Sequence, residues 1–276
     1  MPEDTGQPGE VTRLLDLAWE ELEAEDLDAA LLYCEQALAL DPHDADAWYC
    51  MGECRMEGRE PGRALDAFRR AVLSDPTHSD AWVSLGNLHL MFRQHEESRR
   101  AFNRALREDP DNPEAWFGRA MLRERRGDWD GADRDLARAA RIDSESWPFP
   151  LPLTDEDLEG AVEEAVRSLH PSLREYIANV AILVDEVPSD EILSQYDPPI
   201  WPGELLGTFT GYSLMERSTE DPWSQLPSSI VLFRRNLQRF ARNRETLVEE
   251  LRITIYHEVG HFLGLDEDDL KERGLD

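Results

Sequence analysis

The sequence predicts an all-α solenoid of helix pairs followed by a small α+β domain. A repeat of 34 residues runs through the first half of the chain, a segment with alternating prolines follows, and the second half mixes short apolar runs with helical patterns. At 276 residues the chain is long enough for two domains that each bury a core of their own. We place the boundary between them at the proline-rich segment, residues 145 to 154.

The composition narrows the possible partners of the protein. The formal net charge is −30 and the sequence pI is about 4.5, with acids in excess in both halves. The phosphate backbone of a nucleic acid would be repelled by such a chain, so we expect no nucleic-acid partner. The N-terminus lacks a signal-peptide pattern, and no apolar run approaches the ~18 residues of a membrane span. We therefore expect a cytoplasmic protein that does not associate with membranes, and the oligomeric state stays open.

The three cysteines all lie in the first half, at Cys34, Cys50 and Cys54. Cys50 and Cys54 are four residues apart on one predicted helix, a spacing that could hold a metal ion. Cysteine is also a common small core residue in reduced proteins. We favour buried, reduced thiols at these positions.

Residues 1 to 10 are polar with proline and glycine, and we expect a disordered tail there. The repeat follows. Asp-Pro begins at residues 41, 75 and 109, and Ala-Trp begins at residues 47, 81 and 115. This pattern of small and aromatic residues with a period of 34 resembles the tetratricopeptide repeat (TPR). The resemblance implies four helix pairs over residues 11 to 144, namely 11 to 44, 45 to 78, 79 to 112 and 113 to 144.

Stacked repeats of this kind resemble family members that present a concave groove from the first helix of each pair. The register predicts which side chains line such a groove here: Leu15, Trp19, Tyr49, Glu53, Val83, Asn87, Leu90, Phe117 and Met121. They mix apolar anchors with acids, so we expect the groove to receive an apolar or basic segment of a peptide or protein partner. In the alternative, the groove packs against the second domain.

The second half of the chain alternates helical and strand patterns. Thr154 and the acids after it predict the start of a helix that runs to about residue 170, and Pro171 opens another. Strand patterns cover residues 180 to 184, 205 to 214 and 230 to 233, with a short helix expected at 189 to 196. Residues 155 to 276 therefore predict a small α+β domain.

A patterned helix at residues 244 to 265 carries the strongest chemical motif. His257 and His261 lie one turn apart on one face, so their imidazoles can bind a single zinc ion. Glu258 follows the first histidine, where it can act as a general base on a metal-bound water. Gly264 can end the helix in a left-handed turn. Glu267, ten residues after His257, is placed where a third protein ligand is needed, which leaves a fourth position open.

From about residue 155 onward the chain resembles the small bacterial zincin-like metallopeptidases, also called minimal metalloproteases. In that family the motif is HExxHxxGxx followed usually by Asp, and the matching position here is Glu267, with Asp266 or Asp268 as alternative ligands. The resemblance implies a zinc-dependent metallopeptidase, in which the TPR array recruits a partner or substrate. The alternative is a non-catalytic interaction or scaffold protein, whose zincin-like domain binds metal or only folds.

Overall fold

The computed structural model describes residues 7–178, 180–211 and 228–264. The chain divides into two compact units. One comprises Met1–Trp147 together with Asp190–Trp201, and the other comprises Pro148–Ser189 together with Pro202–Asp276. Residues 190 to 201, which the sequence places in the second domain, thus pack with the repeat array.

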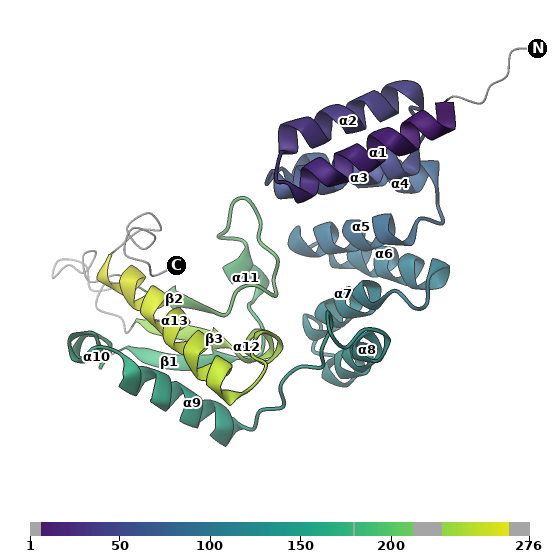
Figure 1. The fold of residues 1–276 in the computed structure, drawn as a ribbon. Coiled ribbons are helices and arrows are strands. Elements are labelled where there is room, and N and C mark those ends of the chain that lie inside the picture. Colours follow the sequence, from purple (N-terminus) through teal and green to yellow (C-terminus); the bar gives the residue numbers. More distant parts are fainter. Residues whose placement is uncertain (1–6, 179, 212–227, 265–276) are drawn as a thin grey trace, which may run out of the picture. The chain divides into compact units, whose positions relative to one another are not determined.

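The first unit contains four antiparallel helix pairs that follow one another along the array (Figure 1). This confirms the predicted helical solenoid. The helices are α1 Gln7–Glu23, α2 Leu27–Leu40, α3 Ala45–Glu57, α4 Pro61–Ser74, α5 Ser79–Met91, α6 His95–Glu108, α7 Pro113–Glu124 and α8 Trp129–Ile142.

Helix α1 begins at Gln7, within the stretch of residues 1 to 10 for which the sequence predicts a disordered tail. Proline is tolerated in the first turn of a helix, where its missing N–H has no intrahelical partner to lose. Glu10 lies near the helix start and accepts hydrogen bonds from Arg13, at 2.7 Å for its Oε1. These local features extend the helix into a stretch whose composition is that of a tail.

The tryptophan that follows each Asp-Pro turn forms a hydrogen bond to that turn. The indole Nε1 of Trp48 donates to the carbonyl of Pro42 at 3.0 Å, and Trp82 and Trp116 repeat this contact with Pro76 and Pro110 at 2.9 and 2.8 Å. The three partly buried tryptophans are therefore part of the repeat packing, with each indole N–H paired to a turn carbonyl.

The segment from the second half that joins the first unit is held by charge and apolar contacts. It contains α11, Asp190–Leu193. Arg125, with a side chain only 5% exposed, donates to Asp190 at 2.6 Å. Arg93 reaches the carbonyl of Leu193 at 3.4 Å, and Trp201 packs against the apolar cluster of the third and fourth helix pairs.

In its described residues, the second unit has a three-stranded sheet packed with helices, the predicted α+β arrangement (Figure 1). The strands are β1 Ala181–Asp185, β2 Gly207–Thr210 and β3 Ser229–Phe233. β3 lies in the centre, parallel to β1 and antiparallel to β2. The helices are α9 Asp155–Ser168, α10 Pro171–Ile177, α12 Arg234–Phe240 and α13 Arg244–Leu263, of which α9 and α13 pack side by side.

The strand β1 differs from its sequence pattern. Its continuous apolar run favours a strand covered on both faces, yet Leu183 is 50% exposed and Val184 is 39% exposed. Within the described residues β1 pairs only with β3, so it lies at a sheet edge, whereas central β3 buries Ile230 and Leu232 completely. No helix in the described part of the chain combines the length and apolar character that a membrane crossing requires.

Candidate metal centre

The helix α13 positions the predicted motif. Its start is fixed by a capping box, in which Asn243 accepts from the backbone N–H of Thr246 while Thr246 accepts from that of Asn243. Leu247, Leu251, Ile255, Val259 and Phe262 form its buried side. The helix ends at Gly264, whose φ of 87° is left-handed and favours glycine. Local sequence thus defines both ends of the helix, and His257 and His261 hold fixed positions between these ends.

The imidazoles of His257 and His261 converge. Their Nε2 atoms lie 3.1 Å apart, and their ring centroids are 4.7 Å apart with the planes at 82°. Two nitrogens bound tetrahedrally to zinc at ~2.0–2.1 Å would lie about 3.3 Å from each other. Both side chains are half-buried. The pair therefore fits a zinc ion, and Nε2 is the atom that each ring presents.

Glu258 lies beside the two histidines on the buried side of α13. At 3.6 residues per turn it is about 100° around the helix from His257 and about 60° from His261. It is only 7% exposed. A carboxylate in this position is largely shielded from bulk water, which suits a group that moves a proton next to a metal site.

The strand β2 packs against the part of α13 that carries the motif. Phe209 contacts Phe262 with ring centroids 5.7 Å apart. Gly207 comes so close that an added Cβ would lie 2.7 Å from Cγ2 of Thr254. The absence of a side chain at Gly207 therefore lets the strand approach the helix three residues before His257.

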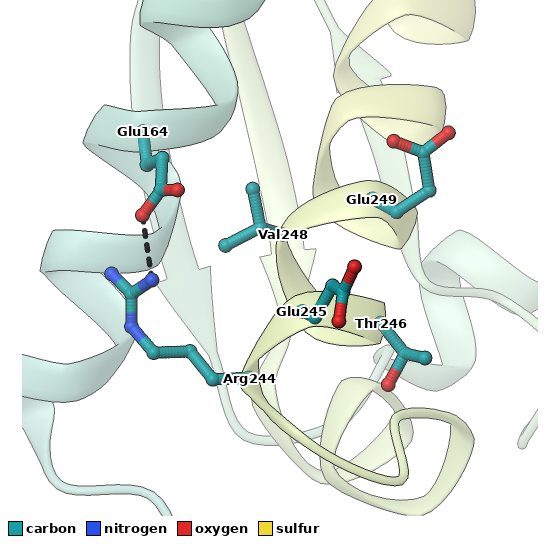
Figure 2. Close-up of a pocket in the computed structure, with 6 residues that line it drawn as sticks. All are labelled: Glu164, Arg244, Glu245, Thr246, Val248 and Glu249. Carbon is teal, nitrogen blue, oxygen red and sulfur yellow. Dashed lines mark hydrogen bonds and ion pairs between the residues drawn. The ribbon is translucent and has the colours of Figure 1, made fainter.

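A hollow of about 670 Å³ lies at the other end of α13 and is distinct from the histidine pair. Figure 2 shows its lining, with Glu164 on α9 accepting from Arg244 at 2.6 Å. Arg244 is 13 residues before His257, so the two are about 20 Å apart along the helix axis. The ion pair is about half exposed, and we assign the hollow no role in the chemistry.

The predicted third ligand, Glu267, lies outside the described residues, as do Asp266 and Asp268. Gly264, the last described residue, turns the chain at the C-terminal end of the histidine helix. The choice among the three carboxylates therefore stays a prediction.

The predicted groove residues behave differently at the two ends of the array. Leu90 and Met121 are buried, with Trp201 packed against their cluster, and Phe117 contacts Trp147 with ring centroids 4.7 Å apart. Asn87 donates to Glu114 at 2.9 Å. In the third and fourth helix pairs, Trp147 and Trp201 thus pack against residues that the sequence places in the groove.

At the first two helix pairs a hollow of about 340 Å³ is open, lined by the predicted groove residues Trp19 and Tyr49. The predicted groove residue Leu15 also lines it, together with four acids and three other residues: Asp16, Asp44, Asp46, Asp80, Val11, Thr12 and His78. Farther along α3, Glu53 accepts from the hydroxyl of Ser84 at 2.9 Å, and burial raises its pKa to about 7. The open part of the groove is therefore aromatic and negatively charged.

Sequence reasoning missed the pairing of Asp190 with Arg125 and the positions of Trp147 and Trp201. None of these residues belongs to a motif. The one available signal was that prolines flank both tryptophans. Prolines predict a segment without regular secondary structure, and a large indole ring in such a segment tends to be buried against another element.

Comparison with known proteins agrees with this architecture. Residues 15–79, 51–113 and 83–146 match the tetratricopeptide repeat family, and residues 177–275 match the zincin-like metallopeptidase family. The chain therefore combines a TPR array with a zincin-like metallopeptidase domain. No curated protein matches the chain.

Solved structures that match part of the chain include some that are described as TPR proteins. A crystal structure of MamA has a TM-score of 0.44 and 22% identity, and covers 50% of this chain and 81% of its own. PilF of Pseudomonas aeruginosa has a TM-score of 0.48 and 18% identity over 63% of this chain and 73% of its own. YrrB, described as a TPR protein with an unusual peptide-binding site, has a TM-score of 0.42 and 21% identity over 60% of this chain and 84% of its own.

Proposed function

We propose that the protein is a zinc-dependent metallopeptidase whose TPR array recruits a partner or substrate. The observation that carries this proposal is the convergence of His257 and His261, with Nε2 atoms 3.1 Å apart, on a helix that also holds the buried Glu258. The match of this region to zincin-like metallopeptidases supports it.

In this proposal His257, His261 and Glu267 hold the zinc ion. When bound, zinc polarises a carbonyl oxygen and makes water a stronger acid. Glu258 takes the proton from the attacking water and later gives it to the leaving amine. Because Glu258 lies on the same helix as two of these ligands, its backbone keeps a constant position relative to theirs. The packing of β2 onto α13 holds that helix against the sheet.

The recruiting role rests on the open end of the groove. Trp19 and Tyr49 offer aromatic surface, and the acids around them favour a positively charged segment. A bound cation near Glu53 would also reduce the free-energy cost of ionising this half-buried carboxyl group, whose pKa is raised. We therefore infer a basic peptide segment with apolar side chains as the partner of this surface.

The metal assignment is tested by zinc analysis of the purified full-length chain. The variant His257→Ala/His261→Ala should hold one zinc ion per chain fewer than the wild type, because it lacks both imidazoles. Zinc affinity should fall as the pH is lowered, because protein ligands bind a metal ion only in their deprotonated form.

Glu267→Ala should also lose zinc, whereas Asp266→Ala and Asp268→Ala serve as matched controls that keep it. Equal zinc in the wild type and the double histidine variant would overturn the site. Loss of zinc in Asp266→Ala or Asp268→Ala, with retention in Glu267→Ala, would move the third ligand to that aspartate.

A further inference from the structure

The three cysteines meet at one point in the core of the repeat array. Cys34 lies on α2, while Cys50 and Cys54 lie on α3, and all three are free thiols. Their Sγ atoms all lie within 4.8 Å of one another. Cys34 and Cys50 are fully buried and Cys54 is 1% exposed. The sequence spacing brought together only the last two, and the packing of α2 against α3 adds the third.

The other repeats show what packing alone requires at two of these positions. The counterparts of Cys34 in the next two helix pairs are Phe68 and Phe102, both fully buried. The counterparts of Cys54 are Leu88 and Leu122, which are 1% and 2% exposed. Large apolar side chains fill these places elsewhere in the same array. A small core residue is therefore not a requirement of the fold at either position.

We propose that Cys34, Cys50 and Cys54 form a binding site for a soft, thiophilic metal ion with three sulfur ligands. Sulfur atoms that surround such an ion at ~2.3 Å lie about 4 Å from each other, which small side-chain adjustments of this cluster supply. Thiolate ligands select soft ions over hard ones such as Mg²⁺ or Ca²⁺. The surrounding side chains, among them Val11, Leu14 and Ala37, are apolar and keep water away.

Binding replaces three S–H bonds by three bonds between sulfur and the metal, and the protons pass to solvent. No electron is transferred, so the step needs no oxidant or reductant. The site is separate from the histidine pair, because it lies in the other unit of the chain.

Cadmium is a suitable probe, since bonds between thiolate sulfur and Cd²⁺ absorb in the ultraviolet whereas bonds to imidazole do not. The full chain is unfolded under reducing conditions and refolded with Cd²⁺, because the buried thiols are closed to solvent once folded. We expect one thiolate-bound Cd²⁺ per chain, and three sulfur neighbours by X-ray absorption. The same sulfur-bound ion should be present in His257→Ala/His261→Ala, which separates this site from the zincin-like centre.

Two variants replace a cysteine by the residue at the equivalent position of the next repeat, so that the array still folds. Cys54→Leu copies Leu88, and Cys50→Ser copies Ser84. Each should weaken Cd²⁺ binding by about 100-fold or more, and circular dichroism should show unchanged helix content. If either variant fails to fold, the sulfur count in the wild type decides. Fewer than three sulfur neighbours, wild-type affinity in a folded variant, or a disulfide formed in place of metal binding would overturn the proposal.

Discussion

Glu53 is a half-buried acid in a groove that is already negatively charged. Its carboxyl group is 2.9 Å from the hydroxyl of Ser84, and burial raises its pKa from 4.5 to about 7. Between these two pH values the folded chain keeps a proton on Glu53 that the unfolded chain releases. The contribution of Glu53 to the free energy of unfolding therefore falls as the pH rises through this window.

We expect Glu53→Gln to remove this pH dependence while it keeps an acceptor for Ser84. The variant should match the wild type near pH 4 and exceed its free energy of unfolding at pH 8, by about 3 kcal/mol at most. Urea unfolding at both pH values measures the difference. Glu57→Gln, an exposed position on the same helix, is the control. A gain that is equal at both pH values would contradict the account.

Single residues also show which parts of the two candidate metal sites could be predicted from the sequence and which could not. His257, Glu258 and His261 could be placed because they lie within one turn of a single helix, whose period fixes their relative directions. Cys34 could not be joined to Cys50 and Cys54 in this way, because that contact depends on how two helices pack. Comparing the repeats position by position would have singled out the cysteines, since Phe and Leu occupy two of the equivalent positions elsewhere.

At the scale of elements, the approach of β2 to α13 determines how firmly the histidine helix is held. Gly207→Ala would place a Cβ 2.7 Å from Cγ2 of Thr254. We expect the second unit to lose about 1–3 kcal/mol of stability, because strand and helix must move apart. Calorimetric unfolding measures this as a lower transition temperature of that unit.

Gly160→Ala is the matched control for this substitution. Gly160 lies on α9 in the same unit, and an added Cβ would meet nothing closer than 4.0 Å. Alanine favours a helix over glycine by about 0.5–1 kcal/mol, so this variant should be as stable as the wild type or more so. Equal effects of the two substitutions would show that Gly207 is not a point of close approach.

The elements themselves were predictable to the extent that local sequence defines them. The helix pairs follow from the 34-residue period, and the start of α9 follows from Thr154 and Asp157, which form its capping box. The exposure of Leu183 was not predictable, because an apolar run does not show whether its strand lies at the centre or the edge of a sheet. The helical start at Gln7 was masked by a polar, proline-containing composition.

At the scale of the whole molecule, the repeat array divides into a filled part and an open part. Trp147 and Trp201 occupy the later helix pairs, whereas the hollow lined by Trp19 and Tyr49 is open. The docking of residues 190 to 201 could not be foreseen, because contacts between segments far apart in a chain leave no periodic signal. The open end is where we expect a partner.

Recruitment of a basic partner can be tested with a labelled peptide rich in lysine and leucine. Trp19→Ala should weaken its binding about tenfold, and Asp46→Asn should weaken it a few-fold, with a further loss as salt is added. Asp66→Asn is the matched control, because Asp66 is 78% exposed, close to the 76% of Asp46, but lies on α4 away from the hollow. If the wild type and all three variants bind the peptide with equal affinity, this surface is not the recruiting site.

The central claim, that the chain is a zinc peptidase with Glu258 as its general base, is tested most directly by one comparison. Peptide cleavage by the zinc-loaded wild type is measured beside Glu258→Gln, over a set of unfolded and lysine-rich peptides. Glutamine keeps the size of the side chain and cannot accept the proton, so zinc content should be unchanged while the rate falls by about 100-fold or more. Wild-type cleavage that persists at full rate in Glu258→Gln, or no cleavage by a wild type that holds zinc, would contradict the account.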